Sequence, residues 1–239
     1  MNASSGEAVR SERTFPRFTA GQRWEHSLLI LTFTVLLLTG LPQKFRDASW
    51  SRYILATPDR VELVRTIHHT AAVAFLLEAA FHLGRGLVLL ARRRLSAAIF
   101  PTMQDLRDAG QMVRYLLFLS PRRPRYGKYS FEQKFTYWFL FFGFGILIVS
   151  GLILWFPTIV TRVLPGGLIP AAKLAHSSEA LVSAIFVVLW HFFHVHIERL
   201  NLSIFTGRLN ESDMRRHHGQ EFERLTGEAA SDESTGDGG

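Results

Sequence analysis

Four long apolar segments constrain this chain of 239 residues more than any other feature. A helix needs about 20 mostly apolar residues to cross the hydrocarbon core of a bilayer. The segments are Ser27–Leu41 (flanked by His26 and Pro42), Thr66–Leu90, the uncharged Phe135–Phe156, and Ala171–Ile197. The sequence therefore predicts an all-α, integral membrane four-helix bundle.

The remaining sequence contains no stretch long enough to suggest a separate soluble domain. We predict an N-terminal tail over residues 1–20, a four-helix domain over 21–226 and a disordered acidic tail over 227–239. A candidate amphipathic helix over Asp105–Leu119 would lie at the membrane surface or pack on the bundle. Its apolar face would consist of Leu106, Ala109, Met112, Val113, Leu116 and Leu117.

The distribution of basic residues predicts the orientation of the spans, because Lys and Arg are enriched on the cytoplasmic side. Nineteen of them lie in the two tails and the central connecting segment, and seven lie in the other two loops. Both termini are therefore expected in the cytoplasm, as an even number of spans requires. The net charge of +7 suits an anionic lipid surface, and no nucleic-acid partner is expected.

Cysteine is absent from the chain. This excludes disulfide frameworks, thiolate metal sites, cysteine-ligated iron–sulfur clusters and haem attached covalently through C-x-x-C-H.

Histidines lie inside two of the predicted spans, where ionisable side chains are costly and usually functional. His68 and His82 lie on the second span, and His176 and His191 lie on the fourth. These pairs are 14 and 15 residues apart, about 21–22 Å along a helix. Both spans enter from the outer side, so His68 and His176 share an outer level, and His82 and His191 share an inner level. His26 lies at the inner end of the first span.

Two facing helices with imidazoles at two matching depths fit two stacked bis-histidine haems. Without cysteine these would be b-type haems, held by iron–imidazole bonds and packing. A proton relay that uses Glu78 and Glu179, or hydrogen bonding alone, is the alternative interpretation. We interpret His69, His194 and His196 as packing or interfacial residues, and His217 and His218 as solvent-exposed.

Several segments between Gln22 and Leu225 together resemble one protein family. They are Arg23–His26 (RWEH), Thr39–Pro42 (TGLP), Arg65–His68 (RTIH), Gly127–Lys134 (GKYSFEQK), Ser150–Trp155 (SGLILW), His176 with His191, and Ser203–Leu209 followed by His217 and His218. The chain resembles the formate dehydrogenase gamma-subunit family of membrane cytochromes b. Related anchors occur in nickel–iron hydrogenases, thiosulfate reductases and multihaem-cytochrome quinone oxidoreductases. The segment Gly127–Lys134 is the most specific of these similarities.

The resemblance implies that His68 and His176 ligate an outer haem b, and that His26 and His191 ligate an inner one. From depth alone, His82 remains a rival for the inner position. A third haem, held by His82 and His194, also stays open. The spacing between His176 and His191 exceeds the family's usual fourteen residues by one.

The resemblance also implies a quinone site, for menaquinone or ubiquinone, at the inner surface. Its candidate residues are Tyr129, Ser130, Gln133 and Lys134. Hydroxyl and amide groups hydrogen-bond quinone carbonyls, and a lysine stabilises a reduced, charged form. Helix capping and snorkelling at the interface are the alternative roles for these residues.

The chain has no motif for molybdenum, nickel or an iron–sulfur cluster. Its catalytic subunit would be another polypeptide, and an iron–sulfur or multihaem cytochrome c subunit would meet it on the outer side. The expected function is therefore a dihaem, quinone-reactive subunit of a respiratory oxidoreductase in the bacterial inner membrane, surrounded by lipid. A haem-free transporter or proton relay and a structural membrane anchor are the competing interpretations.

Overall fold

The computed structural model describes residues 13–94, 96–197 and 200–228. These residues form two compact units. The membrane unit comprises residues 20–97 and 134–201, and the terminal unit brings together described residues before 20, between 98 and 133, and after 201. The loose tail expected over residues 1–12 and the acidic end over residues 229–239 lie outside the described part of the chain.

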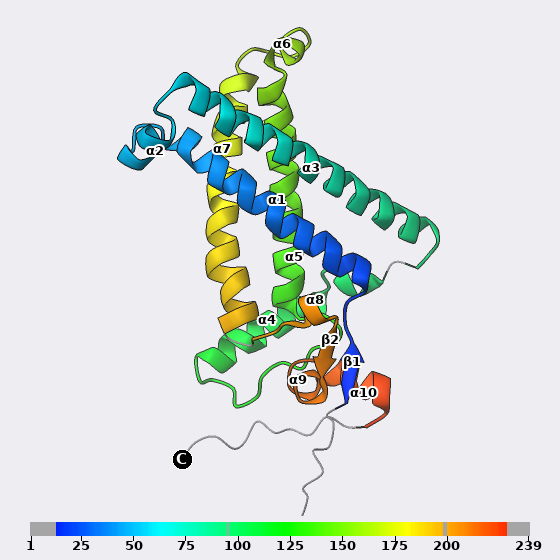
Figure 1. Cartoon of the computed structure of the whole chain (residues 1–239). Helices are drawn as coiled ribbons and strands as arrows, with labels where there is room; N and C mark the ends of the chain where they lie inside the picture. The colour runs from blue at the N-terminus through cyan, green and yellow to red at the C-terminus, as the bar shows by residue number, and fades with distance from the viewer. Residues whose placement is uncertain (1–12, 95, 198–199, 229–239) are drawn as a thin grey trace, which may run out of the picture. The chain divides into compact units, whose positions relative to one another are not determined.

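Four long helices make up the membrane unit and continue beyond the predicted apolar segments (Figure 1). They are α1 (Ala20–Lys44), α3 (Pro58–Ala91), α5 (Phe131–Trp155) and α7 (Leu168–Phe186), which continues as the π-helix η2 (Val187–Ile197). Short helices α2 (Ser49–Ile54) and α6 (Pro157–Val160) lie in the connections. All four long segments have the length and apolar character of membrane spans, which confirms the prediction of four.

The outer surfaces of these helices are apolar. Leu31 on α1, Leu77 on α3 and Leu189 on η2 are 61%, 66% and 69% exposed. Exposed apolar area of this extent is unfavourable in water and ordinary in contact with acyl chains. The surface of the membrane unit is therefore built for lipid.

Aromatic rings join the spans internally. The ring centroid of Phe144 on α5 lies 5.6 Å from that of Phe33 on α1 and 5.3 Å from that of Phe75 on α3. Phe139 on α5 stacks on Phe186 of α7 at 4.1 Å. Offset and edge-to-face contacts at these distances contribute packing energy beyond the area they bury.

In the terminal unit, residues from the two ends of the chain form a small antiparallel sheet. Strand β1 (Thr14–Pro16) pairs with β2 (Arg208–Asn210), with Phe15 opposite Leu209. Helices α8 (Ser203–Thr206), α9 (Glu211–His217) and α10 (Gly219–Thr226) accompany the sheet. Phe15 packs on a core of Leu209, Met214 and Phe222, the last of which is completely buried.

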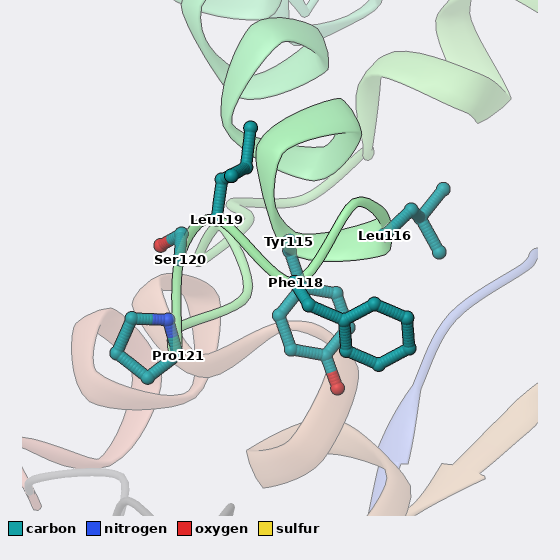
Figure 2. A pocket seen from close by; sticks show the side chains of 6 residues that line it. All are labelled: Tyr115, Leu116, Phe118, Leu119, Ser120 and Pro121. Carbon is teal, nitrogen blue, oxygen red and sulfur yellow. The ribbon is translucent and has the colours of Figure 1, made fainter.

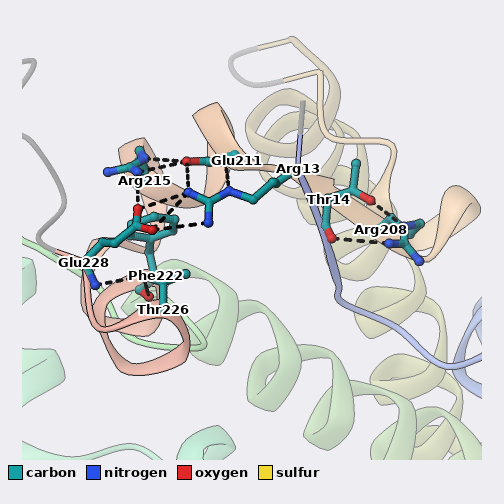
Figure 3. Close-up of polar contacts among 8 residues, drawn as sticks. All are labelled: Arg13, Thr14, Arg208, Glu211, Arg215, Phe222, Thr226 and Glu228. Carbon is teal, nitrogen blue, oxygen red and sulfur yellow. Dashed lines mark hydrogen bonds and ion pairs between the residues drawn. The ribbon is translucent and has the colours of Figure 1, made fainter. Parts of the chain in front are cut away.

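Two arginines and two glutamates join the same ends of the chain electrostatically (Figure 3). Arg13 pairs with Glu211 at 2.7 Å and with Glu228 at 3.0 Å, and Arg215 pairs with the same two carboxylates at 2.9 and 2.8 Å. Hydrogen bonds from Arg13 are the largest cause that lowers the pKa of both carboxyl groups below its usual range. Glu228 is therefore a paired residue of the terminal unit.

Helix α4 (Met103–Leu116) confirms the amphipathic helix predicted over Asp105–Leu119, and the short 3-10 turn η1 (Ala97–Ile99) precedes it. The helix begins with a capping box between Thr102 and Asp105. It ends at Leu116 because Phe118 adopts a positive φ of 58° and the Leu119 N–H donates to the Arg114 carbonyl. The turn exposes Leu116, Phe118 and Leu119 around a shallow surface pocket (Figure 2).

Candidate functional site

The outer histidines predicted from sequence lie together. His68 projects from α3 and His176 from α7, and their ring centroids are 6.4 Å apart with 73° between the ring planes. Both residues lie in the interior of their helices and are 108 positions apart in the sequence, so tertiary packing alone brings the two rings together. The match in depth inferred from the sequence is therefore realised as a direct pairing of two rings.

A second pair of rings joins α1 to η2. The ring centroids of His26 and His191 are 6.2 Å apart, with 48° between the ring planes. The two pairs therefore involve all of α1, α3, α7 and η2, and each pair takes one ring from the first two spans and one from the last two.

Both separations fit one metal bound between two imidazoles. A metal–imidazole bond of about 2 Å, with roughly 1 Å more from the nitrogen to the ring centre on each side, gives about 6 Å between centroids. Among the described residues no three His, Cys, Asp or Glu side chains converge on one point, so a cage made only of protein ligands is not formed there. Pairs of imidazoles at this separation could hold the iron of a b-type haem.

The rings of the outer pair are held by the neighbouring spans. Thr39 Oγ1 on α1 lies 2.9 Å from His68 Nδ1, and Ser150 Oγ on α5 lies 3.1 Å from His176 Nδ1. The residue after each hydroxyl is a glycine. A Cβ at Gly40 would lie 3.4 Å from His68 Cε1, and a Cβ at Gly151 would lie 3.1 Å from His176 Cε1. Each ring is thus bonded on one side and closely approached by backbone.

The π-helix explains how His191 reaches its partner. In a regular α-helix, 15 steps from His176 would point His191 about 60° away from the His176 direction. Helix η2 begins at Val187, between the two histidines. A π-helical turn contains more residues and so rotates less per residue, which reduces this offset and absorbs one extra residue. The fifteen-residue spacing is therefore compatible with ring pairing.

His82, the rival inner ligand, has other partners. Its Nδ1 lies 3.0 Å from Glu25 Oε2 and its Nε2 lies 3.2 Å from the hydroxyl of Tyr137. Arg85 pairs with the same Glu25 carboxylate at 3.1 Å. Both ring nitrogens of His82 are therefore engaged in a polar network that links α1, α3 and α5.

Of the other histidines, His69 and His194 follow the interpretation from sequence, and one residue departs clearly from it. His69 stacks on Trp155 at 4.2 Å, and His194 Nδ1 lies 2.8 Å from the Trp190 carbonyl, as expected of packing residues. The side chain of His196 lies outside the described part of the structure. The exception is His218, which is 1% exposed, so the prediction of a solvent-exposed side chain is wrong.

His218 is buried because the C-terminal helices bind the segment before α5. Its Nδ1 lies 2.9 Å from the Gly127 carbonyl, and the side chain of Gln220 donates to the Arg125 carbonyl at 2.8 Å. This contact joins two predicted motifs, Gly127–Lys134 and the His217–His218 pair. Sequence reasoning missed it because nothing local marks a contact between positions 91 residues apart.

The segment Gly127–Lys134 uses two of its candidate residues to start α5. The Gln133 N–H donates to Ser130 Oγ at 3.4 Å, and the Ser130 N–H donates to Gln133 Oε1 at 3.3 Å. This reciprocal pair is a capping box, which satisfies N–H groups that a helix start leaves without partners. Ser130 is completely buried. The capping role considered at the level of sequence is therefore present, whatever else these residues do.

Arg17, which the sequence analysis did not single out, lies against the same segment. Its guanidinium lies 5.3 Å from the centroid of the Tyr129 ring and donates to Gln133 Oε1 at 3.3 Å. Burial lowers the pKa of this arginine from its usual value. Lys134, the fourth candidate, follows in α5 and is half-buried.

Membrane-spanning helices that bring two pairs of imidazoles to this separation define a membrane-embedded cytochrome of the b type. The chain belongs to the prokaryotic cytochrome b561 family, whose family model matches residues 17–207. It is a multi-pass protein of the bacterial inner membrane.

Curated relatives are similar at modest identity. The cytochrome b556 subunit of formate dehydrogenase from Haemophilus influenzae is 26% identical over 151 residues, which cover 62% of this chain and 57% of that subunit. The chain therefore spans little more than half the length of this relative. The cytochrome b556(fdo) subunit of formate dehydrogenase from Escherichia coli K12 is 26% identical over 188 residues, which cover 77% of this chain and 80% of that subunit.

Proposed function

We propose that this chain is a dihaem, quinone-reactive membrane subunit of a multi-subunit respiratory oxidoreductase. The observation that carries the proposal is the presence of two imidazole pairs, each at the separation of paired axial ligands and each bridging different spans. When bound, haem b supplies a one-electron carrier at each pair. The histidines hold the cofactor, and the apolar spans exclude water from it.

In this proposal His68 and His176 hold the outer haem, and His26 and His191 hold the inner haem. The assignment of His26 rather than His82 follows from the ring separation and from the bonds of His82 to Glu25 and Tyr137. His82 and Arg85 then anchor Glu25, the neighbour of His26 in sequence. A third haem is not part of the proposal.

The quinone would bind at the segment that precedes α5. Gln133 accepts two hydrogen bonds on its side-chain oxygen, from Arg17 and from the Ser130 N–H, and its amide N–H₂ group is the donor we propose for a quinone carbonyl. Tyr129 supplies a hydroxyl and an aromatic face, Ser130 holds the start of the helix, and Lys134 supplies a positive charge for the reduced form. The quinone would be menaquinone or ubiquinone.

Other polypeptides would complete the enzyme. The named relatives are subunits of formate dehydrogenases, and by analogy this chain would assemble with a catalytic subunit and an iron–sulfur or multihaem cytochrome c subunit. We place that partner on the outer side of the membrane. The four-helix domain over residues 21–226 would span the membrane with both termini in the cytoplasm, which is the orientation that the basic residues favour.

The haem proposal is tested by the colour of the purified full-length protein. Reduced-minus-oxidised spectra should show b-type bands, with two haems per chain. His68→Ala and His176→Ala should each lose the same haem, and His26→Ala and His191→Ala the other, whereas His82→Ala should retain both. A colourless protein would reject the proposal in favour of a haem-free transporter, proton relay or anchor. Retention of both haems in His26→Ala with loss in His82→Ala would reverse the inner assignment.

The quinone proposal is tested by separating the amide of Gln133 from its capping oxygen. Gln133→Glu keeps an oxygen that can cap α5 but removes the N–H donors, whereas Gln133→Ala removes both. We expect both variants to slow quinone turnover at unchanged haem content. If Gln133→Glu turns over quinone like the unmodified protein while Gln133→Ala is slow, the residue acts through the helix cap and the quinone contact is excluded.

A further inference from the structure

The two ligands of the outer pair meet the same short sequence on two different helices. Thr39 and Gly40 on α1 face His68, and Ser150 and Gly151 on α5 face His176. A leucine follows the glycine in both sequences. In both cases the hydroxyl oxygen lies about one hydrogen-bond length from Nδ1 and the glycine lies nearest to Cε1. The membrane unit therefore repeats one arrangement around its two outer rings.

The hydroxyl hydrogens are committed elsewhere. Thr39 Oγ1 donates to the Val35 carbonyl at 2.7 Å, and Ser150 Oγ donates to the Ile146 carbonyl at 2.5 Å. A hydroxyl has one hydrogen to donate, so toward the ring each oxygen is an acceptor. It follows that the proton lies on Nδ1 of each histidine.

A backbone carbonyl gives the same answer independently for His176. Its Nδ1 also lies 3.1 Å from the carbonyl oxygen of Leu147. A carbonyl can only accept, so the ring nitrogen that meets it must carry hydrogen.

A neutral imidazole with hydrogen on Nδ1 has its lone pair on Nε2. We propose that Thr39 and Ser150 are positioning residues that hold His68 and His176 in the tautomer whose Nε2 binds the haem iron. This inference rests on the proposed haem function. An acceptor on Nδ1–H also makes the imidazole a stronger donor to iron, which favours the oxidised metal and fixes the angle of the ring.

The test uses the purified full-length protein and changes one hydroxyl at a time. Ser150→Ala removes the acceptor without adding bulk, and Thr39→Val removes it at nearly constant shape. Thr39→Ser restores the hydroxyl, and Thr34→Val, at an exposed position of the same helix, is the matched control. The readouts are the midpoint potentials of the two b-type components, the electron paramagnetic resonance spectrum of the oxidised protein, and the rate of haem transfer to excess apo-globin.

We expect Ser150→Ala and Thr39→Val to move one of the two components to more positive potential and to change its resonance signal. Haem transfer from that component should become about tenfold faster or more. Thr39→Ser and Thr34→Val should match the unmodified protein. Loss of the outer haem from Thr39→Val alone would also support the inference.

Two results would overturn the inference. One is a pair of Ser150→Ala and Thr39→Val proteins whose potentials, resonance signals and transfer rates equal those of the unmodified protein. The other is equal damage in Thr34→Val, which would assign the effect to packing of α1. Both leave the haem proposal standing, because that proposal fails only if the unmodified protein lacks haem.

Discussion

Replacement of Gly151 by alanine should weaken haem binding at the outer pair. A Cβ at this position would lie 3.1 Å from Cε1 and 3.5 Å from Nδ1 of His176, so the ring must shift by a few tenths of an ångström. Overpacking of this kind costs about 1–3 kcal/mol. If the whole cost falls on the ligand, the affinity for the outer haem decreases roughly 5- to 150-fold.

Alanine substitutions at two other glycines should have smaller effects and allow the prediction to be compared with the approach distances. A Cβ at Gly40 would lie 3.4 Å from His68 Cε1, at the edge of ordinary contact, so Gly40→Ala should cost less than Gly151→Ala. Gly145 lies on α5 with Gly151 and a Cβ there meets nothing within 4 Å, so Gly145→Ala is the matched control. The expected order of damage is Gly151, then Gly40, then Gly145.

The assay is the haem-to-protein ratio from difference spectra, followed over time with excess apo-globin as the haem acceptor. Gly145→Ala should keep the outer haem as long as the unmodified protein does. Equal retention in Gly151→Ala and Gly145→Ala, or faster loss from Gly40→Ala than from Gly151→Ala, would refute the argument from close approach.

Three predictions concern the terminal unit, each read from hydrogen exchange at the amides of β1 and β2. Phe222→Ala should destabilise the unit by about 3–5 kcal/mol, because the ring is completely buried, whereas Leu225→Ala on the same helix, 48% exposed, should cost less than about 1 kcal/mol; similar effects would show that Phe222 is not a core residue. Because Arg13 lowers the pKa of Glu211 and Glu228, their contribution to stability should be complete above the usual carboxyl value of 4.5 and decrease as the pH falls through the lowered pKa values; protection relative to the intrinsic exchange rate that stays constant in acid would contradict this. His218→Ala should cost about 1–3 kcal/mol by leaving the half-buried Gly127 carbonyl without its bond, and protection equal to that of His217→Ala would argue against it.

The membrane spans and the outer ring pair could be predicted because their signals are local. Hydropathy over about 20 residues identifies a span. Matching depth on two spans that both enter from the outer side then places His68 level with His176, and their ring centroids lie 6.4 Å apart. The hydroxyl–glycine pairs at Thr39–Gly40 and Ser150–Gly151 are part of the sequence motifs. Their role could not be predicted, because it depends on which ring atoms they contact across the helices.

The inner pair could not be chosen from depth alone. His26 and His82 both lie near the inner end of their spans, and a helical wheel assumes a constant rotation per residue. The π-helix from Val187 breaks that assumption, and the bonds of His82 to Glu25 and Tyr137 depend on how three helices pack. Neither effect leaves a pattern in a single sequence.

The terminal unit was missed for a different reason. Strand pairing joins Phe15 to Leu209, and the ion pairs join Arg13 to Glu211 and Glu228. Each strand has only three residues, which is too short for an alternating pattern to stand out. Read from the sequence alone, each short polar end of the chain looks like a loose tail, because the partner with which it pairs is far away in the sequence.

Each ring pair links one of the first two spans to the fourth span, and this has a consequence for biogenesis. A metal held by both rings of a pair would act as a cross-link between two helical hairpins that insert one after the other. Any ligand that binds only the assembled form stabilises it by a free energy that grows with the logarithm of its concentration over its dissociation constant. Cells short of haem would then carry hairpins joined only by side-chain contacts such as those of Phe144, and turnover of the subunit would follow cofactor supply.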